Sequence, residues 1–263
     1  TIPDSFDAFV DYATARLTED PHLWAVTLLD ELRPLGYEGS YPTLTRQIRA
    51  RGLRPACTAC AHVTKRANAV IEHPPGEETQ FDWLELPDAP VQWAYPRKGA
   101  YVLVGSLSHS SKTRAWFSES DDQAHLIVGI DEVLRRLGGT GREWRVDRMA
   151  TVIKVGTSEV QRSFVPVAKH YGVTVVPCPP RHGNRKGVVE KNIDFITRRW
   201  WRTARVATMT EAQASLDRFC VEVADQRRRG DTTVGAAGDA EPLLGLPAAA
   251  YPAEVTVVRT VAA

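Results

Sequence analysis

Three carboxylates stand where a metal-dependent reaction could use them. Asp82 lies within an apolar run at 79–86, Asp147 ends the short run 144–147, and Glu190 follows a loop rich in Pro, Gly and basic residues. Carboxylate oxygens are the ligands that Mg²⁺ and Mn²⁺ prefer, and a pair of such ions can drive phosphoryl transfer on DNA. We therefore predict a two-metal site in which Asp82, Asp147 and Glu190 are both the metal ligands and the catalytic residues.

The elements expected to hold these acids alternate between strand and helix from residue 77 onward. Strand patterns and helix patterns follow one another at 79–86, 100–107 and 113–118 (strands), 124–137 (helix begun by Asp121 or Asp122), 143–147 (strand), 158–171 (helix begun by Ser158), 173–176 (strand) and from about 185 (long helix). The order βββαβαβα predicts an α/β fold with an RNase H-like sheet. In the first strand, Asp82 would share a face with Leu84 and Leu86, opposite Phe81 and Trp83.

Each acid alone also has an ordinary structural explanation. Asp82 could face solvent on an edge strand, Asp147 could cap a turn, and Glu190 could pair with Lys186 along a helix. Their joint order of first strand, fourth strand and late helix favours the metal site. Other nearby acids are assigned to caps, to the surface or to the opposite strand face: Glu85, Asp121, Asp122 and Asp194.

A small all-α domain is expected before the sheet. Residues 4–52 predict three helices, the second capped by Asp20 and ended by Gly36, and the third basic and preceded by the turn 37–40. A helix, a Gly-containing turn and a basic helix form a helix-turn-helix. Its third helix would contact DNA through Thr43, Arg46, Gln47 and Arg49. The alternative is a plain three-helix bundle that serves packing or oligomer contacts.

Charge is informative through its distribution. The net charge of +1 does not by itself indicate a polyanionic partner, but basic residues cluster around Glu190, and such local patches attract a phosphate backbone. Arg181, Arg185 and Lys186 are the candidate phosphate contacts beside the active site. Solvated helix faces are the ordinary alternative for any one cluster.

Composition excludes several classes of protein. No apolar run reaches membrane-spanning length, and four cysteines in 263 residues do not suggest a disulfide framework, so we expect a protein of a reducing cytoplasm. Cys57 and Cys60 with His62, and His73 as a fourth ligand, allow a zinc site. Ordinary thiols are favoured, because no second Cys pair follows at the spacing of a zinc ribbon.

These patterns divide the chain into five parts. We predict a helix-turn-helix domain at 1–55, a linker at 56–76, the RNase H-like catalytic core at 77–206, a C-terminal helix at 207–230, and at 231–263 a linker with the start of a truncated β-barrel. The chain begins at Thr1 and ends in a strand-like run at 255–261, so a fragment of a longer protein is expected.

The residues around the acids resemble the IstA-type bacterial insertion-sequence transposases. Residues 75–83 resemble the first catalytic motif of that family, 147–152 the second, and 169–190 the approach to its catalytic glutamate, while 36–43 is similar to its helix-turn-helix. The resemblance covers roughly residues 20–250. Arg148 departs from it, since the family commonly has Asn after the second aspartate.

The resemblance implies a DDE transposase with a retroviral-integrase-like catalytic core. It implies two Mg²⁺ or Mn²⁺ ions, double-stranded DNA at transposon ends and target as substrate, a homo-oligomer, and an AAA+ helper ATPase as partner. Two other functions stay open from the residues alone. One is a catalytically silent fragment that binds DNA or assists assembly, and the other is a nuclease for RNA–DNA hybrids. A helix-turn-helix ahead of the core argues for duplex DNA and against the second.

Overall fold

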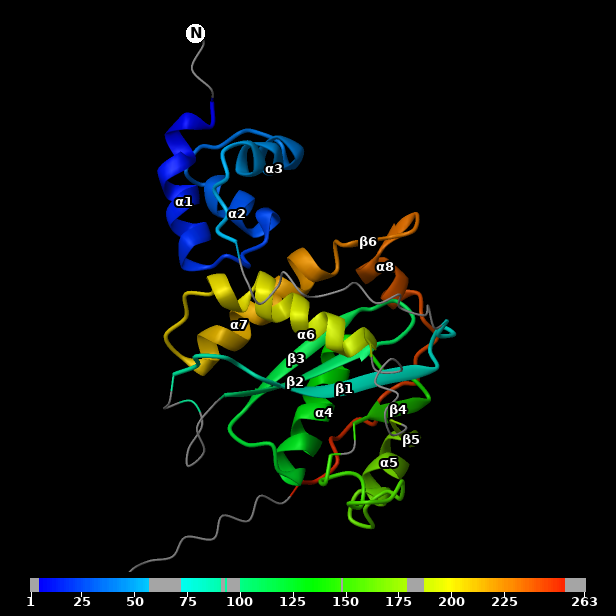
Figure 1. Cartoon of the computed structure of the whole chain (residues 1–263). Coiled ribbons are helices and arrows are strands. Elements are labelled where there is room, and N and C mark those ends of the chain that lie inside the picture. Colours follow the sequence, from blue (N-terminus) through cyan, green and yellow to red (C-terminus); the bar gives the residue numbers. More distant parts are fainter. Residues whose placement is uncertain are drawn as a thin grey trace, which may run out of the picture. The chain divides into compact units, whose positions relative to one another are not determined.

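A computed structural model describes residues 5–56, 72–90, 93, 100–147, 149–178 and 187–253. The chain divides into two compact units, one built from the N-terminal helices and the other from a β-sheet with its helices (Figure 1). Each unit has its own buried apolar cluster.

Between residues 5 and 56, the helical unit contains a 3-10 turn and three helices. These are η1 (Asp7–Phe9), α1 (Val10–Glu19), α2 (Ala25–Leu32) and α3 (Tyr41–Ala50). Leu28 and Leu32 of α2 pack with Leu44 and Ile48 of α3, each pair one helical turn apart, so that each helix turns one apolar stripe to the common core. Ser40 caps α3 by accepting a hydrogen bond from the Thr43 backbone N–H. The predicted third helix is confirmed.

The second helix is shorter than predicted, and its predicted cap is wrong. Asp20 accepts a hydrogen bond from the His22 backbone N–H in a local turn, and α2 begins only at Ala25. The guanidinium of Arg54 donates to the carbonyls of Pro21 and Leu23, so those carbonyls serve a tertiary contact instead of a first helical turn. The helix ends at Leu32, and Gly36 closes the turn that follows, with a φ of 96°.

The second unit is built on a mixed sheet. Its strands are β1 (Glu78–Glu85), β2 (Tyr101–Leu107), β3 (Thr113–Ser118), β4 (Glu143–Val146) and β5 (Thr174–Pro177). They lie in the order β3-β2-β1-β4-β5, with β1, β2 and β3 antiparallel and β1, β4 and β5 parallel. This topology confirms the predicted RNase H-like fold class.

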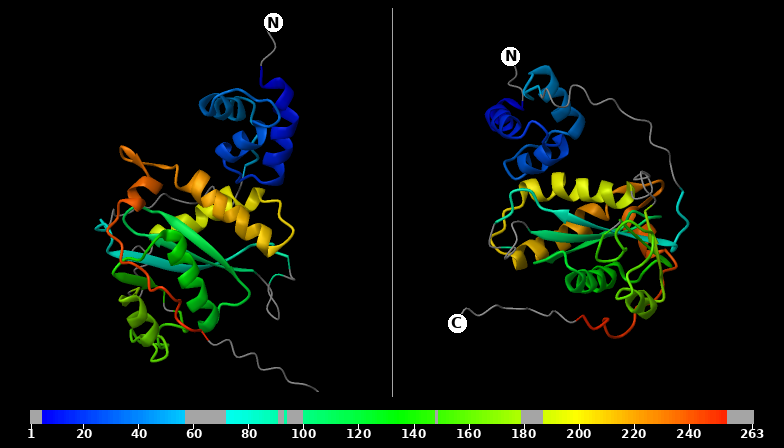
Figure 2. Two further views of the ribbon diagram at one scale, coloured as in Figure 1. Left: turned by 180° about the vertical axis from the view of Figure 1, so that it is seen from behind. Right: turned by 60° about the horizontal axis from the view of Figure 1, so that its bottom comes forward.

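Helices cover both faces of this sheet (Figure 2). α4 (Gln123–Leu137) and α5 (Val165–Tyr171) lie on one face, and α6 (Gly187–Arg199) lies on the other, against β1 and β2. On the α4 face, Phe81 of β1 and Trp144 of β4 meet edge to face with ring centroids 5.6 Å apart. Gly105 of β2 lets α4 approach closely, because a Cβ there would lie 2.4 Å from the Val133 side chain.

Two predicted segments have a different structure. The helix expected from Ser158 begins only at Val165, because Gly156 turns the chain with a φ of 77° and Ile153 pairs with Val160 in a β-bridge.

The stretch 231–253, predicted as a linker, is packed structure. It contains β7 (Thr232–Thr233), which pairs with β6 (Arg228–Arg229), and the helix α8 (Val234–Asp239). Glu241 is buried and accepts hydrogen bonds from the backbone N–H groups of Gly76 and Ser110. Upstream, α7 (Met209–Phe219) continues as a π-helix at Cys220–Ala224. The strand expected at 255–261 lies outside the described residues, and the remaining domain boundaries stay predictions.

Two other expectations concern cysteines and membranes. Cys178 and Cys220 are buried free thiols, whereas Cys57, Cys60 and His62 lie outside the described residues. No helix that the structure describes is both long and apolar enough to span a bilayer.

The cap of α4 provides a test of the fold. Asp122 accepts from the His125 backbone N–H at 3.0 Å, as one of the two predicted caps. Partial burial opposes its ionisation, but the hydrogen bonds from His125 outweigh burial and lower the pKa of Asp122 to about 2. The ionised Asp122 therefore stabilises the folded state fully above the ordinary aspartate pKa of about 3.9, and this contribution is lost as the pH falls toward 2.

We expect Asp122→Ala to lower the free energy of unfolding by about 1 kcal/mol at pH 7, measured by urea denaturation, because one backbone N–H loses its acceptor. The difference from wild type should shrink between about pH 4 and pH 2. Asp122→Asn is the control, since Asn caps as well and does not titrate. A pH-independent difference would contradict a role for the ionised carboxylate.

Candidate active site

Asp82 lies in β1, and Asp147 directly follows the last residue of the neighbouring strand β4. In the parallel register of the two strands, Phe81 is aligned with Val146, and each of these residues is followed by one of the acids. Neighbouring strands lie about 4.8 Å apart, and aligned residues turn to the same face. Phe81, Trp144 and Val146 belong to the core on the α4 side, so both acids face the side covered by α6. Asp147 is exposed and Asp82 is half-buried.

Glu190 comes from the first turn of α6. The buried residues of that helix are Val189, Asn192 and Ile196, so Glu190 stands at the flank of the face that packs on the sheet, and it is exposed. Among the described residues, no three His, Cys, Asp or Glu side chains form a group that could hold a metal ion. The structure thus brings the two aspartates together on one face and places Glu190 on the helix above it, without assembling all three.

Two of the acids that the sequence excluded have structural roles elsewhere. Asp194, one turn after Glu190, forms an ion pair with Arg198 on an exposed part of α6. Asp122 caps α4, and Glu85 is exposed at the end of β1. Asp194 and Asp122 thus have structural partners of their own.

A buried polar network, which the sequence analysis missed, lies on the same sheet face as the two aspartates. Glu78 of β1 is 4% exposed and accepts hydrogen bonds from Gln80 Nε2 at 2.8 Å and from Ser108 Oγ at 2.7 Å. Its other oxygen pairs with the guanidinium of Arg145 on β4, itself 7% exposed. This pair ties β1 to β4 just before the two acids, with Glu78 four residues before Asp82 and Arg145 two residues before Asp147.

The same network reaches α6. Gln80 has no exposed surface, and its Oε1 accepts a hydrogen bond from the Val189 backbone N–H at 3.1 Å. Gln80 precedes Asp82 by two residues and so shares its strand face, while Val189 directly precedes Glu190. The contact therefore fixes the start of α6 next to the aspartates.

A second buried anchor lies at Asn192, which is 1% exposed. Its Nδ2 donates to Ser106 Oγ at 2.9 Å and to the Ser111 carbonyl at 3.2 Å, and its Oδ1 accepts from Arg227 at 2.9 Å. Burial lowers the pKa of the Arg227 guanidinium from its ordinary value, against the opposing charge of Asp225. The sequence signal that could have revealed Gln80 and Asn192 is a polar residue at a position where the strand or helix period requires an apolar one.

Three of the predicted DNA contacts, and the residue that departs from the family pattern, have no described position. Arg181, Arg185, Lys186 and Arg148 lie outside the described residues.

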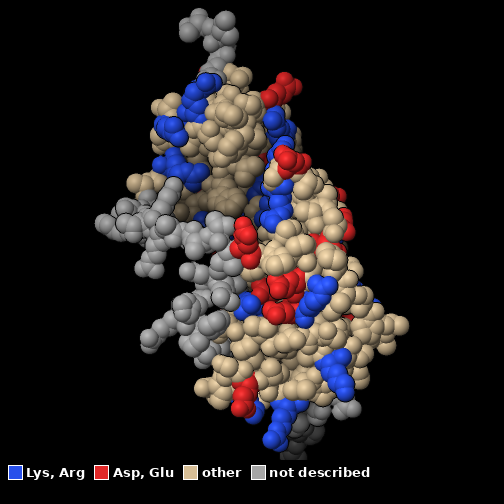
Figure 3. Space-filling model, turned by 90° about the vertical axis from the view of Figure 1, so that its right-hand side faces the viewer, with Lys and Arg blue, Asp and Glu red and all other residues tan. Residues whose placement is uncertain are grey.

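The predicted DNA contacts of the helical unit lie on α3. Arg46 and Arg49 are exposed, and basic side chains stand out over this unit in Figure 3. Thr43 and Gln47 are half-buried; Thr43 Oγ1 shares a hydrogen bond with Ser40, and Gln47 accepts one from Arg51 Nε at 2.9 Å. The two arginines are thus the more accessible members of the predicted set.

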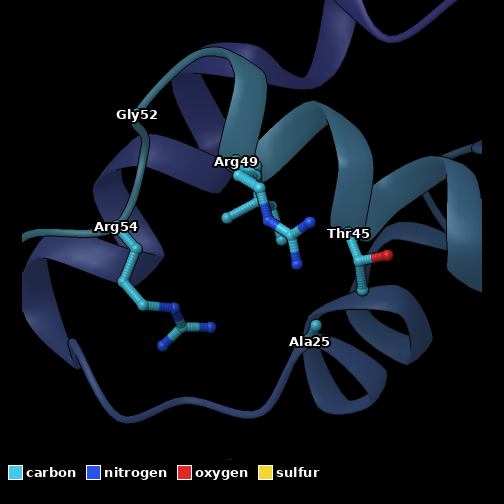
Figure 4. A pocket seen from close by; sticks show the side chains of 6 residues that line it. Ala25, Thr45, Arg49, Gly52 and Arg54 are labelled. Atoms are coloured by element: carbon cyan, nitrogen blue, oxygen red, sulfur yellow. The ribbon is translucent and has the colours of Figure 1, made fainter.

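A hollow of about 420 Å³ opens beside α3. Arg49 and Arg54 point toward it from two sides in Figure 4. It is lined by Ala25, Thr45, Ile48, Arg49, Gly52 and Arg54.

Several curated transposases are similar in sequence to this chain. The IS640 transposase of Shigella sonnei is 26% identical over 225 residues, which are 83% of this chain and 67% of that protein. The IS21 transposase of Pseudomonas aeruginosa is also 26% identical over 225 residues, 83% of this chain and 54% of that protein. A transposase of Aminobacter aminovorans is 30% identical over 206 residues, 74% of this chain and 39% of that protein. No protein-family profile matches.

These matches confirm the resemblance to insertion-sequence transposases of the IS21 type. The chain spans about half the length of the curated relatives, between 39% and 67% of those named here.

Among solved structures, a chain of the simian T-cell lymphotropic virus intasome bound to the PP2A regulatory subunit B56 gamma is similar in fold. It has a TM-score of 0.50 and 13% sequence identity, covering 84% of this chain and 76% of that chain.

The buried pair of Glu78 and Arg145 generates a prediction about stability. Arg145→Met would leave the Glu78 carboxylate buried without its cation, which should cost about 3–5 kcal/mol in the free energy of unfolding. Glu78→Gln combined with Arg145→Met keeps the hydrogen-bonding groups but removes both charges, so denaturation by guanidinium should show most of that loss recovered. A single-variant loss below about 1 kcal/mol would mean that water solvates Glu78.

Proposed function

We propose that this chain, a relative of the IS21-type insertion-sequence transposases, is the DNA-binding and catalytic part of a DDE transposase that cleaves and joins DNA strands. The observation that supports this most is the register of Phe81 with Val146 on adjacent parallel strands, since each is followed directly by one of the aspartates, together with Glu190 in the first turn of the helix that packs on β1 and β2. A carboxylate in a strand and another at the end of its neighbour are held by a rigid element, as a site for positioning phosphoryl transfer requires.

The donor set suits two divalent ions. Asp82, Asp147 and Glu190 offer only carboxylate oxygens, the hard ligands that Mg²⁺ and Mn²⁺ favour. Two such ions, when bound, supply charge stabilisation for the attacking and departing oxygens of a phosphodiester. Glu190 is exposed on the first turn of α6, so its side chain is accessible to a ligand shared with the aspartates.

The remaining work belongs to residues that bind and orient DNA. Arg181, Arg185 and Lys186 immediately precede α6 in the sequence and would contact phosphates beside the acids. Thr43, Arg46, Gln47 and Arg49 of α3 would contact the transposon end. Positioning and charge stabilisation suffice for strand transfer, so no covalent intermediate with the protein is required.

The whole protein would act with partners. The family resemblance implies a homo-oligomer that pairs transposon ends and an AAA+ ATPase that assists it, acting on nucleoid DNA in a bacterial cytoplasm.

A second candidate is a catalytically silent fragment that binds DNA or supports assembly. It is favoured by the absence of an assembled three-carboxylate group among the described residues.

Substitution of the acids separates the two candidates. Asp82→Asn, Asp147→Asn and Glu190→Gln should each reduce Mg²⁺-dependent strand transfer on insertion-sequence ends by more than the roughly 10–100-fold that follows loss of a ligand's supporting partner. Affinity for the DNA should change little. Asp194→Asn, on the same helix, is the matched control and should retain activity. Wild-type rates in an acid variant would remove that residue from the site, and an inactive wild-type chain that still binds ends would favour the silent fragment.

The helix-turn-helix proposal predicts a loss of DNA binding. Arg46→Gln combined with Arg49→Gln should weaken binding to transposon ends by at least about 10-fold and reduce the slope of log K against log salt by about 1–2, since each phosphate contact contributes about 0.9 to that slope. Binding can be measured by fluorescence anisotropy at several salt concentrations. Arg218→Gln on α7 is the single-charge control. An unchanged affinity would favour the plain packing bundle.

A further inference from the structure

Gln80 connects the strand that carries Asp82 to the helix that carries Glu190. Its amide is completely buried and reaches both elements: Nε2 donates to Glu78 and Oε1 accepts from Val189 N–H. Asp82 follows Gln80 by two residues on the same face, and Glu190 follows Val189 by one. A single side chain thus joins the supports of two proposed metal ligands.

The orientation of this amide is imposed by its surroundings. Glu78 is buried and forms an ion pair with Arg145, and a carboxylate accepts hydrogen bonds but donates none. The NH₂ group of Gln80 must therefore face Glu78, which turns the carbonyl oxygen toward α6. The ion pair between β1 and β4 thereby decides which atom of Gln80 meets the helix.

The contact with Val189 acts as a helix cap supplied from another element. Val189 is the third residue of α6, and the N–H at that position is one that helical hydrogen bonds leave without a partner. The usual acceptor for such an N–H is the side chain of the residue just before the helix. Here the acceptor belongs to β1, so the first turn of α6 is held against the sheet at the point where Glu190 begins.

We propose that Gln80 is a positioning residue that sets Glu190 relative to Asp82 and so determines how strongly the three acids bind divalent ions. This inference rests on the proposed function of the acids. In this proposal Gln80 contacts neither DNA nor metal, and it acts by holding α6. Glu78 and Arg145 act through Gln80, because they fix its amide.

Glutamine provides both a donor for the Glu78 carboxylate and an acceptor for the Val189 N–H. Glutamate at this position would keep the acceptor for Val189 but bring two carboxylates together, and methionine would fill similar space but offer no acceptor that replaces the amide oxygen. The contrast between these substitutions separates the hydrogen bond from the packing.

The first experiment compares Gln80→Met with Thr79→Val. Thr79 is the adjacent residue of β1, is equally buried, and its Oγ1 accepts from the Gly141 backbone N–H at 2.9 Å, away from α6. Each substitution removes the acceptor of one buried backbone N–H, and Gln80→Met also removes the donor to Glu78, so Gln80→Met should destabilise the fold at least as much as Thr79→Val.

Only Gln80→Met should speed hydrogen exchange at the start of α6, measured by mass spectrometry without metal. It should also raise the Mg²⁺ concentration for half-maximal strand transfer by about 10–100-fold. Equal exchange at α6 and an equal Mg²⁺ requirement in the two variants would overturn the proposal.

The second experiment exchanges the two side chains. Gln80→Glu alone places two carboxylates in contact and should raise the Mg²⁺ requirement. Glu78→Gln combined with Gln80→Glu restores one donor and one acceptor and keeps a carboxylate within the network. Because Arg145 is aligned with residue 80 in the strand register, its guanidinium can pair with a carboxylate at position 80.

The exchanged pair should recover the Mg²⁺ requirement to within a few-fold of wild type, and should do so even if Gln80→Met fails to fold. No recovery relative to Gln80→Glu would count against Gln80 as the positioning residue.

The acid variants distinguish failure of the proposed function from failure of the role of Gln80. If Asp82→Asn retains activity, the proposed function fails; if Asp82→Asn is inactive while Gln80→Met behaves like Thr79→Val, only the role of Gln80 fails.

Discussion

The register between β1 and β4 is the constraint on which the candidate site depends. Asp82 and Asp147 are 65 positions apart in the sequence, yet the alignment of Phe81 with Val146 makes them neighbours on one face. A slip of one residue would turn one acid into the α4 core. Two features oppose such a slip. Phe81 and Trp144 pack on one face, and Glu78 pairs with Arg145 on the other. An apolar contact and a buried charge pair on opposite faces thus specify the same register.

Much of this arrangement was predictable, because it depends on local patterns. The apolar alternation around Asp82 defines β1, Tyr41 and Pro42 open α3, and Asp122, one of the two caps predicted, stands at the start of α4. In each case the residue that determines the structure lies within a few positions of the element that it starts. The acids were recognisable for a related reason, since a carboxylate in an apolar strand is costly unless it has a partner or a ligand.

The errors arose where distant residues decide the local conformation. Asp20 is a good helix cap by type, but Arg54 takes the nearby carbonyls. The Gly- and Ala-rich stretch after Gly230 has a linker's composition, yet Lys112 of the sheet unit pairs with Asp239, and Glu241 accepts from Gly76 and Ser110. Those partners lie more than 100 residues away in the chain, so no local pattern records them.

The polar residues under α6 show how this face of the sheet differs from the α4 face. An apolar core on the α4 side is tolerant, since side chains of similar volume can replace one another at modest cost. Gln80, Glu78 and Asn192 are not replaceable in that way, because each satisfies partners on two elements, and a buried group left without its partner costs about 1–3 kcal/mol. Hydrogen bonds are also directional, so they fix a helix in rotation and translation more narrowly than apolar contact does. The polar contacts under α6 therefore hold the helix in a narrower range of positions than apolar packing would. The cost is that each buried polar group needs its partner.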